Sequence, residues 1–272
     1  MKISNTLEII SQCWKQAEMN LQTDIRENCP GLNEDEITRA FHKEFVKTLR
    51  TASNYGKIEN AFLKDLNSAF PSIPPYQLAK IPPGLMADVI LHKRNTEGDT
   101  GGDIGLTLTR PFVEYHTHSS SLKIKDYRRG LLCQAKLKNS KGKWSYFSDS
   151  QKKVLDDRLQ YLGILLYKYK DTERHDLDYF QWQLCNEAAS LTDMMNWLKT
   201  SIFPTVVDSE HIIKGIGNGK IGTDNEKVID EIIAPKGNAC LEIIINWPGG
   251  KPDSNVTVYS HSEERQKLYV RH

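Results

Sequence analysis

The sequence lacks any long run of apolar residues. No stretch approaches the roughly 18 residues that a membrane-spanning helix needs, and the most apolar segments, at 162–166 and 241–245, are only long enough for strands. Near the start of the chain, Glu8 interrupts what would otherwise resemble the apolar region of a signal peptide. We therefore expect a cytoplasmic protein with no membrane partner.

Cysteine is scarce, and neither sign of charge dominates. The cysteines form no CxxC pair and have no histidine at zinc-binding spacing, which argues against a disulfide scaffold or a thiolate metal site. We expect reduced thiols at Cys13, Cys29, Cys133, Cys185 and Cys240. With 36 basic and 35 acidic residues, the net charge indicates no class of partner. The length of 272 residues and the 39% hydrophobic content exclude a disordered or fibrous chain.

The spacing of apolar residues predicts helices on either side of a strand-rich middle. Residues 70–83 are rich in proline and predict an extended connector. Helical spacing predicts helices at 4–22, from Asn33 loosely to 66, at 148–160, at 176–200 and at 224–233. The strand patterns lie at 85–92, 103–109, 112–117, 130–138, 162–169, 240–247, 255–260 and 267–270. The glycines of 214–223 predict a flexible turn, because they lack the spacing of a phosphate-binding loop.

The strand predicted at 130–138 has the clearest chemical pattern. Side chains alternate between the faces of a strand, so Gln134 and Lys136 share one face, about 7 Å apart along it. Asp103 lies on an upstream predicted strand and would join them if the two strands were neighbours. Metal-assisted cleavage of a phosphodiester needs this set of groups, because oxygen ligands hold Mg²⁺ and the metal activates a bound water.

Asp103 and Gln134-Ala135-Lys136 resemble the motif of the PD-(D/E)xK nuclease superfamily, with the glutamine typical of its Mrr-like branch. The resemblance implies an α/β fold with a restriction-endonuclease-like central mixed β-sheet flanked by helices. It also implies that Asp103 and Gln134 bind the metal and that Lys136 orients the attacking water. In two respects the chain departs from the family pattern: no proline precedes Asp103, and the long gap to Gln134 requires an extra hairpin through 116–125.

The same resemblance suggests how the chain is divided. Residues 1–30 would form an N-terminal helix, residues 31–170 the nuclease-like core, and residues 171–272 a C-terminal α+β extension of helices and strands. The pattern of the last hundred residues fits either an elaboration of the same sheet or a small second domain.

The family implies a further acid from a helix that precedes the strands, and three glutamates are candidates. Asn33 and Glu36 have the spacing of a capping box, which gives Glu36 a structural role. Glu34 lies in line with Ile37 and the apolar face that should meet the sheet, whereas Glu44 lies half-way down the helix. We therefore predict Glu34 as the catalytic and metal-binding acid, Glu36 as second choice and Glu44 as third.

Residues 121–143 carry eight basic side chains and one acidic side chain. Such a patch is typical of proteins that bind the phosphate backbone, although a solvated hairpin that protects a sheet edge can have the same composition. We assign nucleic-acid binding to Lys123, Lys125, Arg128, Arg129 and Lys138.

The sequence therefore predicts an endonuclease that depends on Mg²⁺ or Mn²⁺ and hydrolyses phosphodiester bonds, with double-stranded DNA as the favoured substrate. Since one such site cuts one strand, cleavage of both strands would call for a homodimer. The alternatives are a catalytically inactive nucleic-acid-binding module on the same fold, and a structural partner whose basic hairpin binds an acidic protein.

Overall fold

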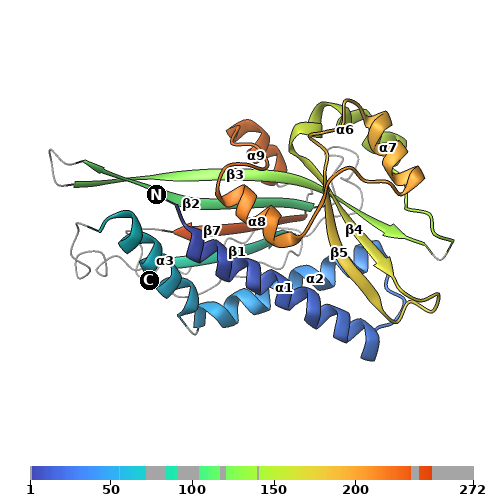
Figure 1. Cartoon of the computed structure of the whole chain (residues 1–272), viewed down its shortest axis with the longest axis horizontal. Helices are drawn as coiled ribbons and strands as arrows, with labels where there is room; N and C mark the ends of the chain where they lie inside the picture. The colour runs from blue at the N-terminus through green and yellow to red at the C-terminus, as the bar shows by residue number, and fades with distance from the viewer. Residues whose placement is uncertain are drawn as a thin grey trace.

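A computed structural model gives the fold of the chain (Figure 1) and describes residues 2–54, 56–71, 84–90, 104–116, 121–139, 141–233 and 239–246. Seven strands form one mixed sheet in the order β1-β7-β2-β3-β4-β5-β6. Helices pack against both faces of this sheet, so the chain has the mixed α/β architecture that the sequence predicts. Among the described helices, none combines the length and apolar character that crossing a membrane requires.

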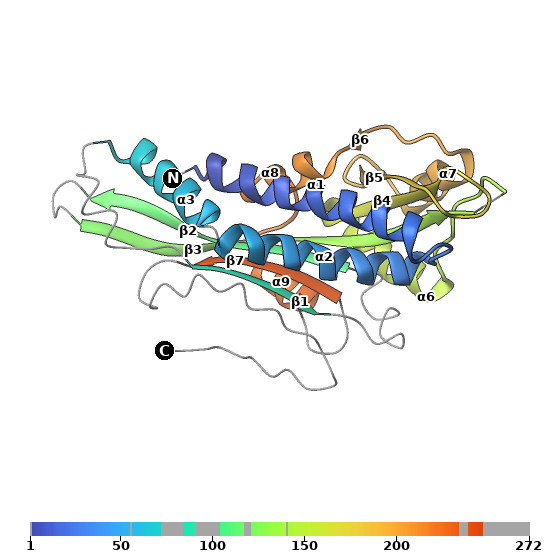
Figure 2. The ribbon, with the colours of Figure 1, turned by 90° about the horizontal axis from the view of Figure 1, so that it is seen from below.

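Four helices pack on one face of the sheet. They are α1 (Ser4–Glu27), α2 (Glu34–Asn54), α3 (Lys57–Ala69) and α8 (Ser209–Gly217). Figure 2 shows α1 and α3 on the same side of the sheet. The helical spacing of apolar residues in α1 serves this packing, because Leu7, Ile10, Trp14, Ala17 and Leu21 are all buried.

The opposite face has its own core, covered by helices from the second half of the chain. These are α6 (Asp149–Leu155), the 3-10 helix η1 (Asp156–Tyr161), α7 (Leu191–Thr200) and α9 (Glu226–Ile233). The predicted helix at 148–160 is therefore confirmed, although its second half is a 3-10 helix.

The long strand β3 (Ser121–Lys138) is the centre of the sheet. Its first part pairs antiparallel with β2 (Ile104–His116), and its last part pairs parallel with β4 (Leu162–Tyr169). The two ladders overlap only at Leu132 and Cys133. The hairpin predicted through 116–125 is the far end of the β2–β3 pair and not an additional hairpin, because the strands predicted at 103–109 and 112–117 belong to one continuous strand.

The outer strands come from segments that lie far apart in the sequence. β7 (Ala239–Asn246) lies between β1 (Gly84–Ile90) and β2, antiparallel to the first and parallel to the second. On the other side, β5 (Leu177–Leu184) and β6 (Val206–Val207) follow β4. The described strands after residue 170, β5, β6 and β7, thus belong to the same sheet as β2, β3 and β4.

The long helix predicted at 176–200 is wrong in its first half, which forms β5. Phe180 and Leu184 are four residues apart, which imitates helical spacing, but burial in β5 follows the strand alternation of Phe180 and Trp182. The true helix begins after Ser190, where a capping box with Asp193 marks its start.

The predicted glycine-rich turn is also wrong in part, because α8 continues through Gly217. A Cβ at Gly217 would lie 2.4 Å from Leu7 of α1, so this glycine allows the two helices to pack closely. The strands predicted at 255–260 and 267–270, and most of the connector at 70–83, lie outside the described residues. The four cysteines whose side chains are described are free, as expected, and Cys240 has no described side chain.

Candidate active site

Three of the predicted catalytic residues, Glu34, Gln134 and Lys136, lie where β3 extends past the end of β2. The last pair of the β2–β3 ladder is Ile104 with Cys133, so the following residues of β3 have no described partner in β2. Trp144 forms a bridge with Lys138 on this edge, and the Ser145 N–H donates to the Leu137 carbonyl oxygen at 3.1 Å.

The first turn of α2 points a carboxylate at this edge. Asn33 and Glu36 form the predicted capping box: the Glu36 N–H donates to Asn33 Oδ1 at 3.1 Å, and Glu36 Oε2 accepts from the Asn33 N–H at 2.8 Å. The cap fixes where the helix begins and thereby places Glu34 in its first turn. Glu36 is thus used in the cap, while Glu44 accepts hydrogen bonds from Asn20 and Lys47.

The Glu34 carboxylate contacts three groups of the β3 region. Its Oε2 accepts a hydrogen bond from the Leu137 N–H at 2.7 Å and another from Ser145 Oγ at 2.5 Å. Its Oε1 lies 3.6 Å from Lys136 Nζ. Of the three candidate acids, Glu34 is the one that these contacts bring to the Gln-x-Lys strand.

Lys136 is held in an enclosed environment. Its side chain is 3% exposed, and its Nζ lies 5.0 Å from the centre of the Phe147 ring, so a carboxylate and an aromatic ring both face the ammonium. The Glu34 side chain is 22% exposed, which makes this carboxylate the more accessible member of the pair.

Gln134 is completely buried on the same face of β3. Neither Oε1 nor Nε2 of its side chain has a hydrogen-bond partner in the described part of the protein. A buried polar group without a partner costs about 1–3 kcal/mol. The Gln134 amide is therefore a place where a bound ion or water would relieve a cost that the protein otherwise bears.

The third predicted ligand, Asp103, lies outside the described residues. Within those residues, no group of three histidine, cysteine, aspartate or glutamate side chains is arranged to hold a metal ion. Of the three predicted metal ligands, the described residues include two, the carboxylate of Glu34 and the amide of Gln134.

The two arginines assigned to nucleic acid have partners within the protein. Arg128 lies 3.1 Å from Asp230 of α9. Arg129 donates to the carbonyl oxygens of Ile221 and Gly222, at 2.7 and 2.8 Å. Acids and carbonyls from about a hundred residues later in the chain thus contact both guanidinium groups, and the assignment of the two arginines to nucleic acid stays a prediction.

Of the three lysines in this assignment, Lys138 lies at the end of β3. Lys138 is half-buried and stands over the Trp144 ring, with Nζ 5.4 Å from the ring centre. The side chains of Lys123 and Lys125 are not among those that the structure describes.

Sequence reasoning missed two residues near this face and a buried histidine elsewhere. Ser145 contacts Glu34, and no motif marks it; Phe147, which the sequence offers only as an aromatic that could stack on bases, contacts Lys136. His42 of α2 is fully buried, and neither ring nitrogen has a partner within the described residues. Burial lowers the pKa of His42 to about 4, which leaves its imidazole neutral at pH 7.

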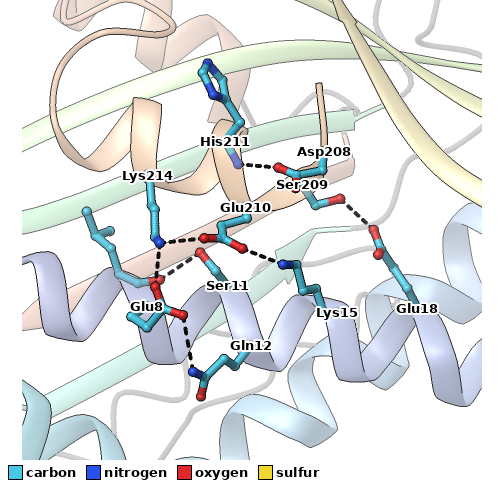
Figure 3. A network of polar contacts seen from close by, with 11 residues as sticks. Glu8, Ser11, Gln12, Lys15, Glu18, Asp208, Ser209, Glu210, His211 and Lys214 are labelled. Atoms are coloured by element: carbon cyan, nitrogen blue, oxygen red, sulfur yellow. Dashed lines mark hydrogen bonds and ion pairs between the residues drawn. The ribbon is translucent and has the colours of Figure 1, made fainter. Parts of the chain in front are cut away.

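A second polar cluster, also missed, joins α1 to α8 (Figure 3). We call it the α1–α8 cluster, and its residues are Glu8, Lys15, Glu18, Ser209, Glu210 and Lys214. Both Lys15 and Lys214 pair with Glu210, and Lys214 also pairs with Glu8. Hydrogen bonds from the two lysines lower the pKa of Glu210 to about 2.

Glu18 occupies the buried end of the α1–α8 cluster. Its Oε1 accepts hydrogen bonds from Ser209 Oγ at 2.5 Å and from the Trp14 indole at 2.7 Å. The Ser209 hydroxyl in turn accepts from the Trp182 indole at 3.1 Å. Desolvation outweighs these donors and raises the pKa of Glu18 to about 7.

Comparison of the chain with family models, with curated proteins and with solved structures finds no match in any of the three.

Proposed function

We propose that the chain is a metal-dependent endonuclease of the PD-(D/E)xK type, with a restriction-endonuclease-like fold and DNA as its substrate. The observation that carries the proposal is the contact between Glu34 and Lys136. A carboxylate from the first turn of α2 comes within 3.6 Å of the lysine in the Gln-x-Lys motif, as such a site requires.

The order of the elements supports the proposal. The helix α2 precedes the β2–β3 hairpin, α6 follows, and β4 then pairs parallel with β3. The resemblance in the sequence implies the same succession of a helix, strands, a helix and a further strand. The insertion of β7 between β1 and β2 is an addition to that pattern.

The oxygen donors suit a hard cation. The carboxylate of Glu34 and the unpartnered amide of Gln134 are ligand types that Mg²⁺ accepts. Asp103, which the sequence motif assigns as the third ligand, would complete the set. Bound Mg²⁺ or Mn²⁺ would supply an activated water and stabilise charge on the phosphate.

The protein groups around the metal would have separate roles. Lys136 would orient the attacking water and neutralise the phosphate. The separation of 3.6 Å from Glu34 is longer than a direct hydrogen bond, so the ammonium keeps donors for a substrate. Glu34 would hold the ammonium in place, since its other oxygen is fixed by the Leu137 N–H and the Ser145 hydroxyl.

Incubation with supercoiled plasmid tests the proposal, with Mg²⁺, with Mn²⁺ and with EDTA. We expect nicking that requires the metal and that Lys136→Met abolishes, since methionine keeps the apolar stem beside Phe147 and removes the charge. Lys152→Met on α6 is the matched control and should cut as the wild type does. Undiminished cutting by Lys136→Met, in a protein that melts normally, would exclude this site.

A catalytically inactive nucleic-acid-binding module is the second candidate. The burial of Gln134 and the 3% exposure of Lys136 favour it, because a substrate phosphate must reach the lysine. This candidate predicts salt-sensitive DNA binding without metal-dependent nicking, and binding that Asp103→Ala leaves unchanged.

A further inference from the structure

A small basic cavity lies at the end of β3. It has a volume of ≈ 260 Å³, and the turns that follow β3 and β4 contribute to its lining. Lys138 and Lys168 are partners in the parallel ladder, so both strands end at this cavity. Ligands of α/β sheets commonly bind at the carboxyl ends of parallel strands. We call the cavity the basic pocket, and its charged lining residues are Lys138, Lys168, Lys170, Asp171 and Arg174.

Two of the four cations in the basic pocket have carboxylate partners. Lys168 Nζ lies 3.6 Å from Asp178, and Lys170 Nζ lies 3.2 Å from Asp176. In the described part of the chain, neither Lys138 nor Arg174 takes part in an ion pair. Counting Asp171 of the lining together with the two paired aspartates, the four cations leave the pocket with an excess of one positive charge.

The turn that carries Arg174 is fixed by its own hydrogen bonds. The carboxylate of Asp171, the one acid of the lining, accepts from the His175 N–H at 2.9 Å and from the Asp176 N–H at 3.1 Å; these neutral donors leave its negative charge in place. The Arg174 carbonyl oxygen accepts from the Gly31 N–H at 3.0 Å. Arg174 has a φ of 61°, a left-handed conformation that is unfavourable for arginine and that this turn nevertheless holds.

We infer that the basic pocket binds a phosphate group of the polynucleotide, next to the phosphate that Lys136 would contact. Arginine and lysine together suit phosphate, because the guanidinium donates in pairs and the ammonium adds a point charge. The volume is below the roughly 300–1,000 Å³ of small-molecule sites, which fits one phosphate group with water.

The position of the pocket along β3 sets which phosphate it would hold. Lys138 follows Lys136 by two residues on the same strand face, about 7 Å away. That distance is comparable to the spacing of successive phosphates along one strand of nucleic acid. The identity of the ligand as a polynucleotide rests on the proposed function, whereas the excess positive charge of the pocket does not.

Binding of a fluorescein-labelled single-stranded oligodeoxynucleotide in EDTA tests the inference without cleavage. The variant Lys138→Met/Arg174→Asn removes both charges, while methionine keeps the contact with Trp144 and asparagine tolerates a positive φ. We expect about tenfold weaker binding and a salt dependence whose slope is smaller by about 0.7, because one phosphate contact on a single strand is lost. The matched control is Lys43→Met/Arg50→Gln on the exposed face of α2, which makes the same change in net charge and should bind normally.

Equal loss of affinity in the two double variants, or no loss in either, would overturn the inference. If the double variant of the pocket unfolds, Arg174→Asn alone is measured. We expect half of the change in salt slope, and an unchanged slope would contradict the inference. The plasmid assay separates this inference from the proposed function. If the wild-type protein never cuts but the pocket variants weaken binding, the proposed nuclease activity is rejected and the inference about the pocket stands. If the wild-type protein cuts but the pocket variants bind normally, the inference about the pocket is rejected and the proposed activity stands.

Discussion

The α1–α8 cluster and the candidate active site differ in how completely their polar groups are hydrogen-bonded. In the α1–α8 cluster, Ser209 both donates to Glu18 and accepts from Trp182, and Glu210 is shared by two lysines. In the candidate active site, the amide of Gln134 is buried without any partner in the described residues, and Lys136 has one carboxylate at 3.6 Å.

The difference separates polar groups that stabilise the fold from those that are available to a ligand. A complete network leaves little to gain from a bound molecule, because each donor and acceptor is already used. An unpartnered buried amide gives a ligand something to stabilise, at the expense of the free energy of folding. Four measurements test this contrast.

The largest expected effect is the pH dependence of stability that Glu18 causes. Its pKa is about 7 in the folded state and near 4.5 ordinarily, so the folded state binds more protons between these values. The free energy of unfolding should therefore fall by about 3 kcal/mol as the pH rises from 4.5 to 7, and level off above. Denaturant unfolding at several pH values should show this fall in the wild type and lose it in Glu18→Gln; an equally steep fall in the variant would refute the assignment.

The next effect is the loss of the Ser209 hydroxyl. Ser209→Ala leaves the Trp182 indole without its acceptor and Glu18 with one donor fewer, in a site where Ser209 is buried. We expect the free energy of unfolding to fall by about 2 kcal/mol, measured by urea denaturation. A loss no larger than that of an exposed serine-to-alanine change would mean that the network contributes little.

The two buried glutamines of the sheet should respond in opposite directions. Gln183 is also fully buried, but it donates to the Leu184 carbonyl oxygen at 2.6 Å and accepts from the Thr205 N–H at 3.2 Å. We expect Gln183→Met to lower the free energy of unfolding by about 1 kcal/mol, and Gln134→Met to raise it by about 1 kcal/mol in EDTA. Gln134→Met should also abolish the proposed cleavage, and a destabilisation equal to that of Gln183→Met would remove the distinction between them.

The smallest effect belongs to the exposed rim of the α1–α8 cluster. Lys15 pairs with Glu210, but its side chain is 48% exposed, and Lys214 remains as a second partner. Lys15→Met should change the free energy of unfolding by less than about 0.5 kcal/mol, and raised salt should make the difference smaller still. A change comparable to that of Ser209→Ala would show that the rim matters as much as the buried end.

Local patterns in the sequence predicted the parts of the site that depend on neighbouring residues. The capping box of Asn33 and Glu36 is visible as a spacing, and it leaves Glu34 as the acid that reaches the sheet. The strand at 162–169 matches β4 because a short apolar run between turns is typical of a buried parallel strand.

Contacts between distant parts of the chain could not be predicted in this way. Arg128 and Arg129 look like free charges on a basic hairpin, and their partners come from the segment 221–230. The misassigned helix at 176–184 has a local cause: Ser190 and Asp193 mark the true helix start, and this capping box was a signal that could have been read. No sequence pattern predicts that the Gln134 side chain lacks a hydrogen-bond partner among the described residues.

The position of β7 has a consequence for how the protein is made on the ribosome. In the described sheet β1 pairs only with β7, and β2 meets β7 on the edge that faces away from β3. Until residues 239–246 have left the ribosome, 84–90 has no partner strand and one edge of β2 stays open. Unpaired strand edges are prone to aggregate. A nascent chain that stalls before residue 239 should therefore depend on chaperones, even though its helices and the β2–β3–β4 centre are already synthesised.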